Sequence, residues 1–237
     1  MNKLSDIKVI GFDLGETLIE YVDVPLSWKI FYPEIFNKIN EANNLGLSSK
    51  QIGMICSNLE KFNTRISPRE IEFSAEHIFF DILNDFRIED DVIIKKIIPQ
   101  FFSFFQQRIR PFPETERTLN ILKSKGYKIA IVTDVPYGMP DEFVFQDIKS
   151  FAGFIDKTVT SVTAGYRKPN PAGLQIIARY FDITPEEMIY IGNEPKDVEA
   201  AASFGCFPVL INRHDEKKNY SEKFQIKNLG ELTDILN

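Results

Sequence analysis

Short apolar runs recur along the chain, separated by segments in which the hydrophobic positions follow a different spacing. Five of these runs have the length and the β-branched or aromatic content of buried parallel strands. They span residues 8–14, 127–134, 154–161, 188–194 and 206–213. Helical patterns separate the last four runs, and strand and helix in alternation predict an α/β fold with a central parallel sheet and right-handed crossovers.

Three helices are predicted between these strands. Residues 114–125 carry Leu119 and Leu122 on one face, and Gly126 follows as a C-terminal cap. Residues 171–181 and 195–204 show the same periodicity, with Gly205 ending the second of them. One of these helices therefore precedes the second strand, and the other two follow the third and fourth strands, as in a continuous sheet domain with helical connections.

The stretch between the first and second predicted strands has helical periodicity and no convincing strand. Pro99 is expected to kink or break the last helix of this stretch. We predict a helical insert over residues 20–106, a core made of residues 1–19 and 107–237, and a return hinge at residues 108–114. The helical spacing is carried by Phe31, Ile35 and Ile39, by Ile52, Ile55, Leu59 and Phe62, and by Ile94, Ile97, Phe101 and Phe104.

Four phenylalanines crowd into residues 101–105 of the insert. We interpret them as packing within the insert's own core, with the lining of a substrate pocket as the alternative.

Composition and charge narrow the class of protein. The chain has 237 residues, of which 43% are hydrophobic and 26% charged, as in folded proteins with a sizeable core. Its formal net charge of -6 argues against general binding to nucleic acid or to anionic membranes. No apolar run has the length of a membrane span, and the N-terminus lacks the pattern of a signal peptide. Since only Cys56 and Cys206 occur, a reducing compartment fits best, and we expect a cytoplasmic protein.

Histidine is scarce, with only His77 and His214 in the chain. We interpret both as surface or helix-cap residues, so acid–base chemistry must fall mostly on carboxylates or lysine. The segment 214–223 is interpreted as a solvated surface stretch.

Polar side chains gather where the predicted strands end. Because ligands of open α/β sheets bind at the carboxyl ends of the strands, these side chains are the first candidates for a site. Four separate segments supply carboxylates, hydroxyls and a lysine to this edge. They are Asp13, Gly15, Glu16 and Thr17, then Thr133 and Asp134, then Arg167 and Lys168, and finally Asn193, Glu194 and Asp197.

Four motifs in this order resemble the haloacid dehalogenase superfamily, most of whose members are phosphatases. They are FDLGETL at residues 12–18, IVTD at 131–134, GYRKPNP at 165–171 and IGNEPKD at 191–197. The resemblance spans the whole core. It implies a Rossmann-like three-layer core with an inserted helical cap of the C1 type, because the insert falls between the first and second motifs.

The resemblance also implies the roles of the site residues. Asp13 is the expected nucleophile, which attacks phosphorus and forms an aspartyl-phosphate. A carboxylate is a weak nucleophile and the substrate is an anion, so a positive group must offset the negative charge in the site. Lys168 is expected to supply this positive charge. The Thr133 hydroxyl is expected to donate to a phosphoryl oxygen, and Thr17 and Asp134 are expected to bind the substrate.

The family's metal ligands also have counterparts in this chain. The resemblance implies Mg²⁺ held by Asp13, the backbone carbonyl of Gly15, Asn193 and Asp197, an oxygen-rich set of the kind this ion takes. A small phosphorylated molecule is the implied partner, with no nucleic acid and no membrane. The sequence carries no signal of oligomeric state.

Two positions depart from the family pattern. Its phosphatases have a second aspartate two residues after the nucleophile as general acid and base, and this chain has Gly15 there. Loss of such a group typically costs about 10²–10⁴-fold in rate. The residue after Gly192 is aspartate in the family and Asn193 here. An amide oxygen carries no charge, which implies a weaker Mg²⁺ site.

Three functions remain open on these grounds. The first is a Mg²⁺-dependent phosphatase that acts on good leaving groups such as acyl phosphates, or that takes its proton from Glu16 or Glu194. The second is a metal-independent 2-haloacid dehalogenase, since a halide leaves without a proton. The third is a catalytically weakened protein that binds a phosphorylated ligand on the same scaffold.

The dehalogenase hypothesis fits the sequence less well than the phosphatase hypothesis. Dehalogenases have tyrosine where Gly15 stands, and an arginine soon after it, whereas Arg65 is the first arginine here. Asp197 also lies one residue further from Asn193 than the matching pair does in dehalogenases.

Overall fold

The computed structural model describes residues 6–25, 27–106, 108–213 and 224–236. His214 and the predicted surface stretch 214–223 lie outside this part. The chain forms two compact units. The first comprises Met1–Glu20, Arg110–Asp134 and Ile148–Asn237, and the second comprises Tyr21–Ile109 and Val135–Asp147. The second unit thus includes a short segment that directly follows the second predicted strand.

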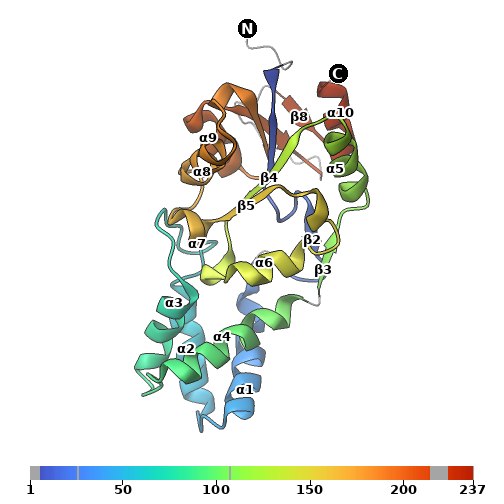
Figure 1. Cartoon of the computed structure of the whole chain (residues 1–237). Helices are drawn as coiled ribbons and strands as arrows, with labels where there is room; N and C mark the ends of the chain where they lie inside the picture. Colours follow the sequence, from blue (N-terminus) through green and yellow to red (C-terminus); the bar gives the residue numbers. More distant parts are fainter. Residues whose placement is uncertain (1–5, 26, 107, 214–223, 237) are drawn as a thin grey trace. The chain divides into compact units, whose positions relative to one another are not determined.

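The first unit is built on a six-stranded sheet with the order β5-β4-β1-β6-β7-β8, in which every pairing is parallel (Figure 1). The five predicted strands are confirmed, and the short β8 is an addition. The strands are β1 (Val9–Phe12), β4 (Lys128–Thr133), β5 (Lys157–Thr160), β6 (Met188–Gly192), β7 (Phe207–Ile211) and β8 (Phe224–Ile226).

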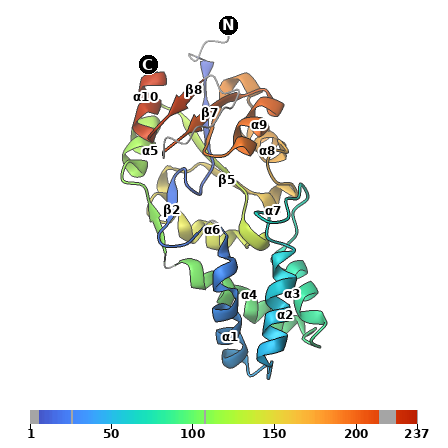
Figure 2. The same cartoon turned by 180° about the vertical axis from the view of Figure 1, so that it is seen from behind.

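Helices cover both faces of this sheet (Figures 1 and 2). On one face, α8 (Ala172–Phe181) and α9 (Pro195–Phe204) bury Leu174, Ile177 and Ala200 against Val9 and Val132. The other face carries α5 (Thr115–Ser124) and α10 (Leu232–Ile235). Because both faces are covered, all four residues of β1 are buried, which explains its unbroken apolar run. The predicted α/β, Rossmann-like three-layer fold and its three helices are confirmed.

The remaining short elements of the first unit connect these layers. They are α7 (Ser161–Ala164), η4 (Ala152–Phe154), η5 (Pro185–Glu187) and η6 (Leu229–Glu231). Gly205, with φ of +93°, ends α9 in the left-handed conformation that glycine adopts readily, as the sequence predicts.

The second unit is helical apart from the edges where the chain enters and leaves it. Its elements include α1 (Tyr32–Asn43), α2 (Ser49–Glu60) and α4 (Asp91–Gln106), which confirm the three predicted helical segments. It further contains α3 (Ala75–Asn84), α6 (Asp141–Asp147), η2 (Trp28–Phe31) and η3 (Pro136–Gly138). His77 lies exposed in the first turn of α3, where its amide donates to the Ser74 hydroxyl at 3.2 Å, in line with the predicted helix-end position.

The helix α4 continues through Pro99, so the helix does not break there, and the alternative of a kink stays a prediction. Proline removes one hydrogen bond of a helix, but burial of a long apolar face holds both sides of Pro99 in the same helix. Phe101, Phe102 and Phe105 are buried on this face, and the Phe105 ring stacks on Trp28 at 3.6 Å between centroids. These contacts confirm the core-packing interpretation of the phenylalanine run.

Two short strands correct the prediction of a strand-free segment. β2 (Ile19–Tyr21) pairs with β3 (Ile109–Pro111), inside the region predicted as the return hinge. The Arg110 guanidinium donates to Glu20 at 2.7 and 2.9 Å across this pair. Strands of three residues are too short to show an alternating pattern, which is why the sequence does not reveal them.

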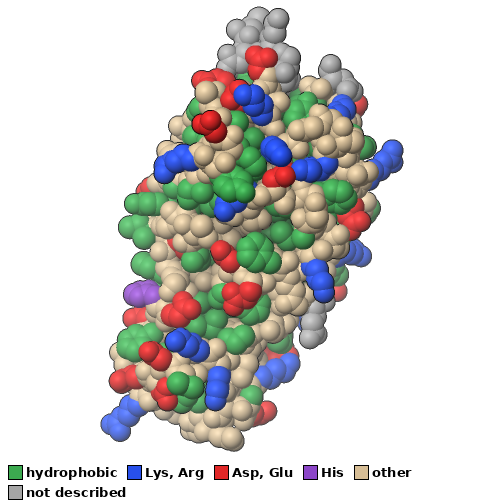
Figure 3. Space-filling model, in the orientation of Figure 1, with side chains coloured by type: hydrophobic (Ala, Val, Ile, Leu, Met, Phe, Trp, Pro, Cys, Tyr) green, Lys and Arg blue, Asp and Glu red, His purple; other side chains and the backbone are tan. Residues whose placement is uncertain are grey.

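Within the described residues, no helix combines the length and the apolar character needed to cross a membrane. On the face of the molecule drawn in Figure 3, acidic and basic side chains are interspersed.

Candidate functional site

The carboxyl ends of the parallel strands lie at one edge of the sheet, and Asp13 directly follows the central strand β1. Its amide donates to the Ile191 carbonyl at 2.8 Å, which fixes the residue against β6. The chain then turns back, with the Leu18 amide donating to the Leu14 carbonyl at 2.8 Å. Within this turn Glu16 has φ of +56°, an uncommon conformation for a residue with a side chain.

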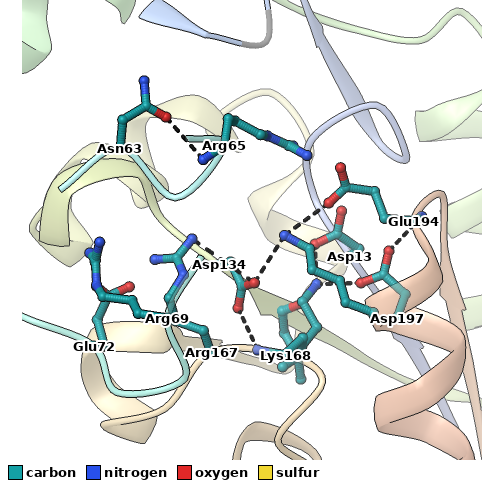
Figure 4. Close-up of polar contacts among 12 residues, drawn as sticks. Asp13, Asn63, Arg65, Arg69, Glu72, Asp134, Arg167, Lys168, Glu194 and Asp197 are labelled. Carbon is teal, nitrogen blue, oxygen red and sulfur yellow. Dashed lines mark hydrogen bonds and ion pairs between the residues drawn. The ribbon is translucent and has the colours of Figure 1, made fainter. Parts of the chain in front are cut away.

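Lys168 makes polar contacts with Asp13, which follows β1, and with residues of β4, β6 and α9 (Figure 4). Its ammonium nitrogen lies 2.5 Å from Asp13 Oδ1 and 2.6 Å from Asp197 Oδ1. It also donates to Tyr190 Oη at 3.0 Å and to the Val132 carbonyl at 3.3 Å. The side chain is 3% exposed, so these interactions occur largely out of water. One buried ammonium group therefore holds both predicted carboxylates of the site in place.

Burial is the main influence on the charges of this cluster. It raises the pKa of Asp13 to about 7, a shift that Lys168 opposes and Asp197 reinforces. Burial alone would lower the pKa of Lys168, but the Asp13 and Asp197 carboxylates hold it well above its ordinary value. Lys168 consequently remains an ammonium group at neutral pH.

The first turn of α9 positions Asp197, because its Oδ2 accepts from the Glu194 amide at 2.9 Å. This side chain packs directly on Gly192, the last residue of β6. A Cβ atom at Gly192 would lie 2.3 Å from Asp197 Cγ and 2.4 Å from its Oδ2. Asp197 can therefore lie here only because Gly192 has no side chain.

A second cluster surrounds Asp134, the residue after Thr133 at the end of β4. Asp134 Oδ1 accepts from the Lys168 amide at 3.0 Å, and its Oδ2 lies 3.0 Å from Lys196 Nζ. Arg167 lies further away, at 4.0 Å. Burial opposes the ionisation of Asp134, but the charges of Lys168, Lys196 and Arg167 hold its pKa below the ordinary value, so Asp134 is ionised.

The predicted residues Thr17 and Asn193 contact each other. The Thr17 hydroxyl donates a long hydrogen bond of 3.5 Å to Asn193 Oδ1. Thr17 is fully buried, and its backbone carbonyl accepts a hydrogen bond from the Arg213 guanidinium at 2.7 Å. Gly15 lies in open surroundings, since a Cβ atom built there would meet no heavy atom within 4 Å. The roles expected of these residues, like those of Thr133 and Asp134, stay predictions.

Two residues of the site are absent from the sequence-based prediction. Tyr190, in the middle of β6, is the third side chain on Lys168, and its hydroxyl also donates to the Val132 carbonyl at 2.6 Å. Its ring passes over Gly11 of β1, where a Cβ atom would lie 3.0 Å from Tyr190 Cδ2. A hydroxyl inside an otherwise apolar strand is the signal that could have revealed it.

Lys196 is the other addition to the site. Its ammonium group pairs with Glu194 at 2.8 Å as well as with Asp134. The signal in the sequence is a lysine in the first turn of a predicted helix, where acidic residues are favoured.

The oxygen atoms near Asp13 have the chemistry of a Mg²⁺ site. Asp13 and Asp197 offer carboxylates, Asn193 an amide oxygen and Gly15 a carbonyl, which are hard ligands of the type this ion prefers. Among the described residues, no group of three or more histidine, cysteine, aspartate and glutamate side chains has metal-binding spacing. The donor set therefore fits Mg²⁺ in ligand type, with two carboxylates rather than three.

A family model of haloacid dehalogenase-like hydrolases matches residues 7–205. The chain therefore belongs to the haloacid dehalogenase-like hydrolase family, as its motifs indicate, and it is a hydrolase.

Phosphatases are among the relatives of this chain. A phosphoglycolate phosphatase of Mannheimia succiniciproducens is 32% identical over 86% of this chain and 85% of its own length. A glyceraldehyde 3-phosphate phosphatase of Methanothermobacter thermautotrophicus is 29% identical over 54% of this chain, and the match spans 59% of that enzyme.

Solved structures confirm the fold. A HAD phosphatase from Thermococcus onnurineus has a TM-score of 0.68 at 21% identity, with 98% of both chains covered. A 2-haloacid dehalogenase from Pseudomonas syringae has a TM-score of 0.70 at 20% identity, covering 97% of this chain and 98% of its own. Since both chemistries share this architecture, the fold alone does not select between them.

We predict that Gly192→Ala lowers the free energy of unfolding by at least about 2 kcal/mol, because the new methyl group overlaps Asp197. Gly15→Ala is the matched control. It meets open space and should stay within about 0.5 kcal/mol of the wild type. Urea unfolding of the three proteins measures both values, and equal stability of the two variants would contradict the close approach at Gly192.

Proposed function

We propose that this protein is a phosphatase that transfers the phosphoryl group of a small phosphorylated metabolite to Asp13 and then to water. The observation that carries the proposal is the buried ammonium group of Lys168, 2.5 Å from Asp13 and 2.6 Å from Asp197 at the carboxyl end of the sheet. The phosphoglycolate and glyceraldehyde 3-phosphate phosphatases among its relatives support a small substrate.

In this proposal an Asp13 oxygen attacks phosphorus, and the bond between phosphorus and the leaving oxygen breaks with its electron pair. Water then attacks phosphorus, which releases inorganic phosphate and restores the Asp13 carboxylate. Lys168 keeps the carboxylate oriented and offsets the negative charge that gathers in the site. Thr133 donates a hydrogen bond to a phosphoryl oxygen, while Thr17 and Asp134 complete the substrate site.

Mg²⁺ is the proposed cofactor, held by Asp13, Asn193, Asp197 and the Gly15 carbonyl. When bound, the ion would neutralise charge on the phosphoryl group. Because Asn193 offers a neutral oxygen, the site should bind Mg²⁺ more weakly than one with a third carboxylate. We further propose that the helical second unit is a C1-type cap and that the protein works in the cytoplasm.

Gly15 determines the class of leaving group. Without an acid at this position, substrates whose leaving group needs no proton, such as acyl phosphates, should react fastest. Glu194 is already paired with Lys196 at 2.8 Å, so it would have to leave this ion pair to reach a leaving group. Glu16 and Glu194 are the two candidates to replace that acid.

The structure adds no specific support for a dehalogenase. The dehalogenase of similar structure shares 20% identity with this chain, a level that reports the fold alone.

The direct test is a panel of phosphorylated compounds assayed with Mg²⁺ and with a chelator, using the wild type and Asp13→Asn. We expect hydrolysis that requires Mg²⁺ and that falls at least about 10³-fold in Asp13→Asn, because an amide does not attack phosphorus. Wild-type activity in Asp13→Asn would contradict the proposed transfer of the phosphoryl group to Asp13.

Restoring an acid at position 15 tests the account of the leaving group. A Cβ atom at position 15 would meet no heavy atom within 4 Å, so a side chain can begin there without a clash. In a single turnover, Gly15→Asp should raise the rate at which an alkyl phosphate releases its leaving group by at least about 10-fold, while changing that rate for an acyl phosphate much less. Gly15→Asn, which has the same shape and no acidic proton, is the control. Equal gains from both variants would show that shape rather than proton transfer limits the reaction.

A further inference from the structure

The position of Lys196 follows from the order of the strands. β4 and β6 lie on either side of β1, which leads directly into Asp13. Lys196 follows β6, yet its ammonium nitrogen reaches Asp134, at the end of β4, across 3.0 Å. A side chain that spans from one flanking strand to the other passes over the end of β1. Its positive charge therefore lies over the edge of the sheet from which Asp13 projects.

Helix stability does not account for a lysine at this point. Lys196 is the second residue of α9, in the turn where the helix dipole disfavours positive charge. Its charge is instead held by two carboxylates, Glu194 at 2.8 Å and Asp134 at 3.0 Å. The ammonium group of Lys168 binds a different pair of carboxylates, Asp13 and Asp197. Lys196 is therefore a separate positive charge at the same edge of the sheet.

Lys196 also differs from its neighbours in accessibility. Its side chain is 29% exposed, compared with 3% for Lys168 and 5% for Arg167. Lys168 is engaged by Asp13, Asp197, Tyr190 and a backbone carbonyl. Of these three cations, Lys196 is thus the one that an anion arriving from solvent can reach most easily.

We propose that Lys196 binds the phosphoryl group of the substrate, exchanging its contact with Glu194 for a phosphoryl oxygen while Asp134 keeps it anchored. The inference rests on the proposed phosphatase function, and it assigns to Lys196 a share of the binding affinity for the phosphoryl group. An incoming phosphate dianion meets carboxylates at Asp13, Asp134, Glu194 and Asp197, so the partly exposed ammonium group of Lys196 lowers the repulsion that this dianion would experience.

Lys196→Gln and Lys196→Arg test this role, with 4-nitrophenyl phosphate as substrate and orthophosphate as competitive inhibitor. Lys8→Gln is the matched control, because Lys8 is also paired with a glutamate, Glu187, but lies at the opposite end of β1. We expect Lys196→Gln to raise KM and the inhibition constant of orthophosphate by about 5- to 30-fold each, with kcat changed less than about 3-fold. Lys196→Arg should recover most of this loss, and Lys8→Gln should match the wild type.

A purely structural role of Lys196, in which it only links α9 to the end of β4, predicts a different result. In that case Lys196→Gln lowers the melting temperature and leaves KM and the inhibition constant unchanged, which would overturn the proposal. Calorimetric titration with orthophosphate separates this inference from the proposed function. Phosphate binding that is strong in the wild type and weakened in Lys196→Gln supports Lys196 even if no substrate is turned over. Equal binding by the two proteins rejects it even if the enzyme is active.

Discussion

The shared ammonium group of Lys168 is the interaction on which the site depends. Two carboxylates from different parts of the chain, Asp13 and Asp197, lie close together in a buried environment, where their mutual repulsion would be large. Lys168 offsets that repulsion and is itself fixed by Tyr190 and the Val132 carbonyl. Removing a partner from such a buried ionic cluster leaves charge uncompensated, which is far more costly than losing a surface ion pair.

The scaffold makes room for this cluster by omitting side chains. Gly192 lets Asp197 lie against the end of β6, and Gly11 makes room for the Met188 and Tyr190 side chains of β6. Both glycines stand within strands, where the residue is otherwise unfavourable. Their presence is explained by close packing around Lys168 and its partners. A third glycine, Gly15, meets no such neighbour, so its absent side chain is a chemical difference from the family pattern rather than a steric need.

Much of this arrangement could be predicted from the sequence, because parallel strands covered on both faces leave long apolar runs. Such runs mark β1, β4, β6 and β7, and their carboxyl ends carry Asp13, Thr133 and Asn193. The strands β2, β3 and β8 are three residues long and carry no periodic signal. Pro99 does not end α4, since tertiary packing outweighs the local cost of proline there. Local signals mark Tyr190 and Lys196, but their partners lie in distant segments of the chain, so the sequence does not show what these two side chains bind.

The central claim is that Asp13 carries the phosphoryl group during turnover. Without an aspartate at position 15 to activate water, the breakdown of an aspartyl-phosphate should be slow, so the intermediate should accumulate. The most direct measurement is mass spectrometry of the wild-type protein, quenched in acid during turnover of an acyl phosphate and then digested. The account predicts one added phosphoryl group on the peptide that contains Asp13. Turnover accompanied by a phosphoryl group on another residue, with Asp13 unmodified, would contradict it.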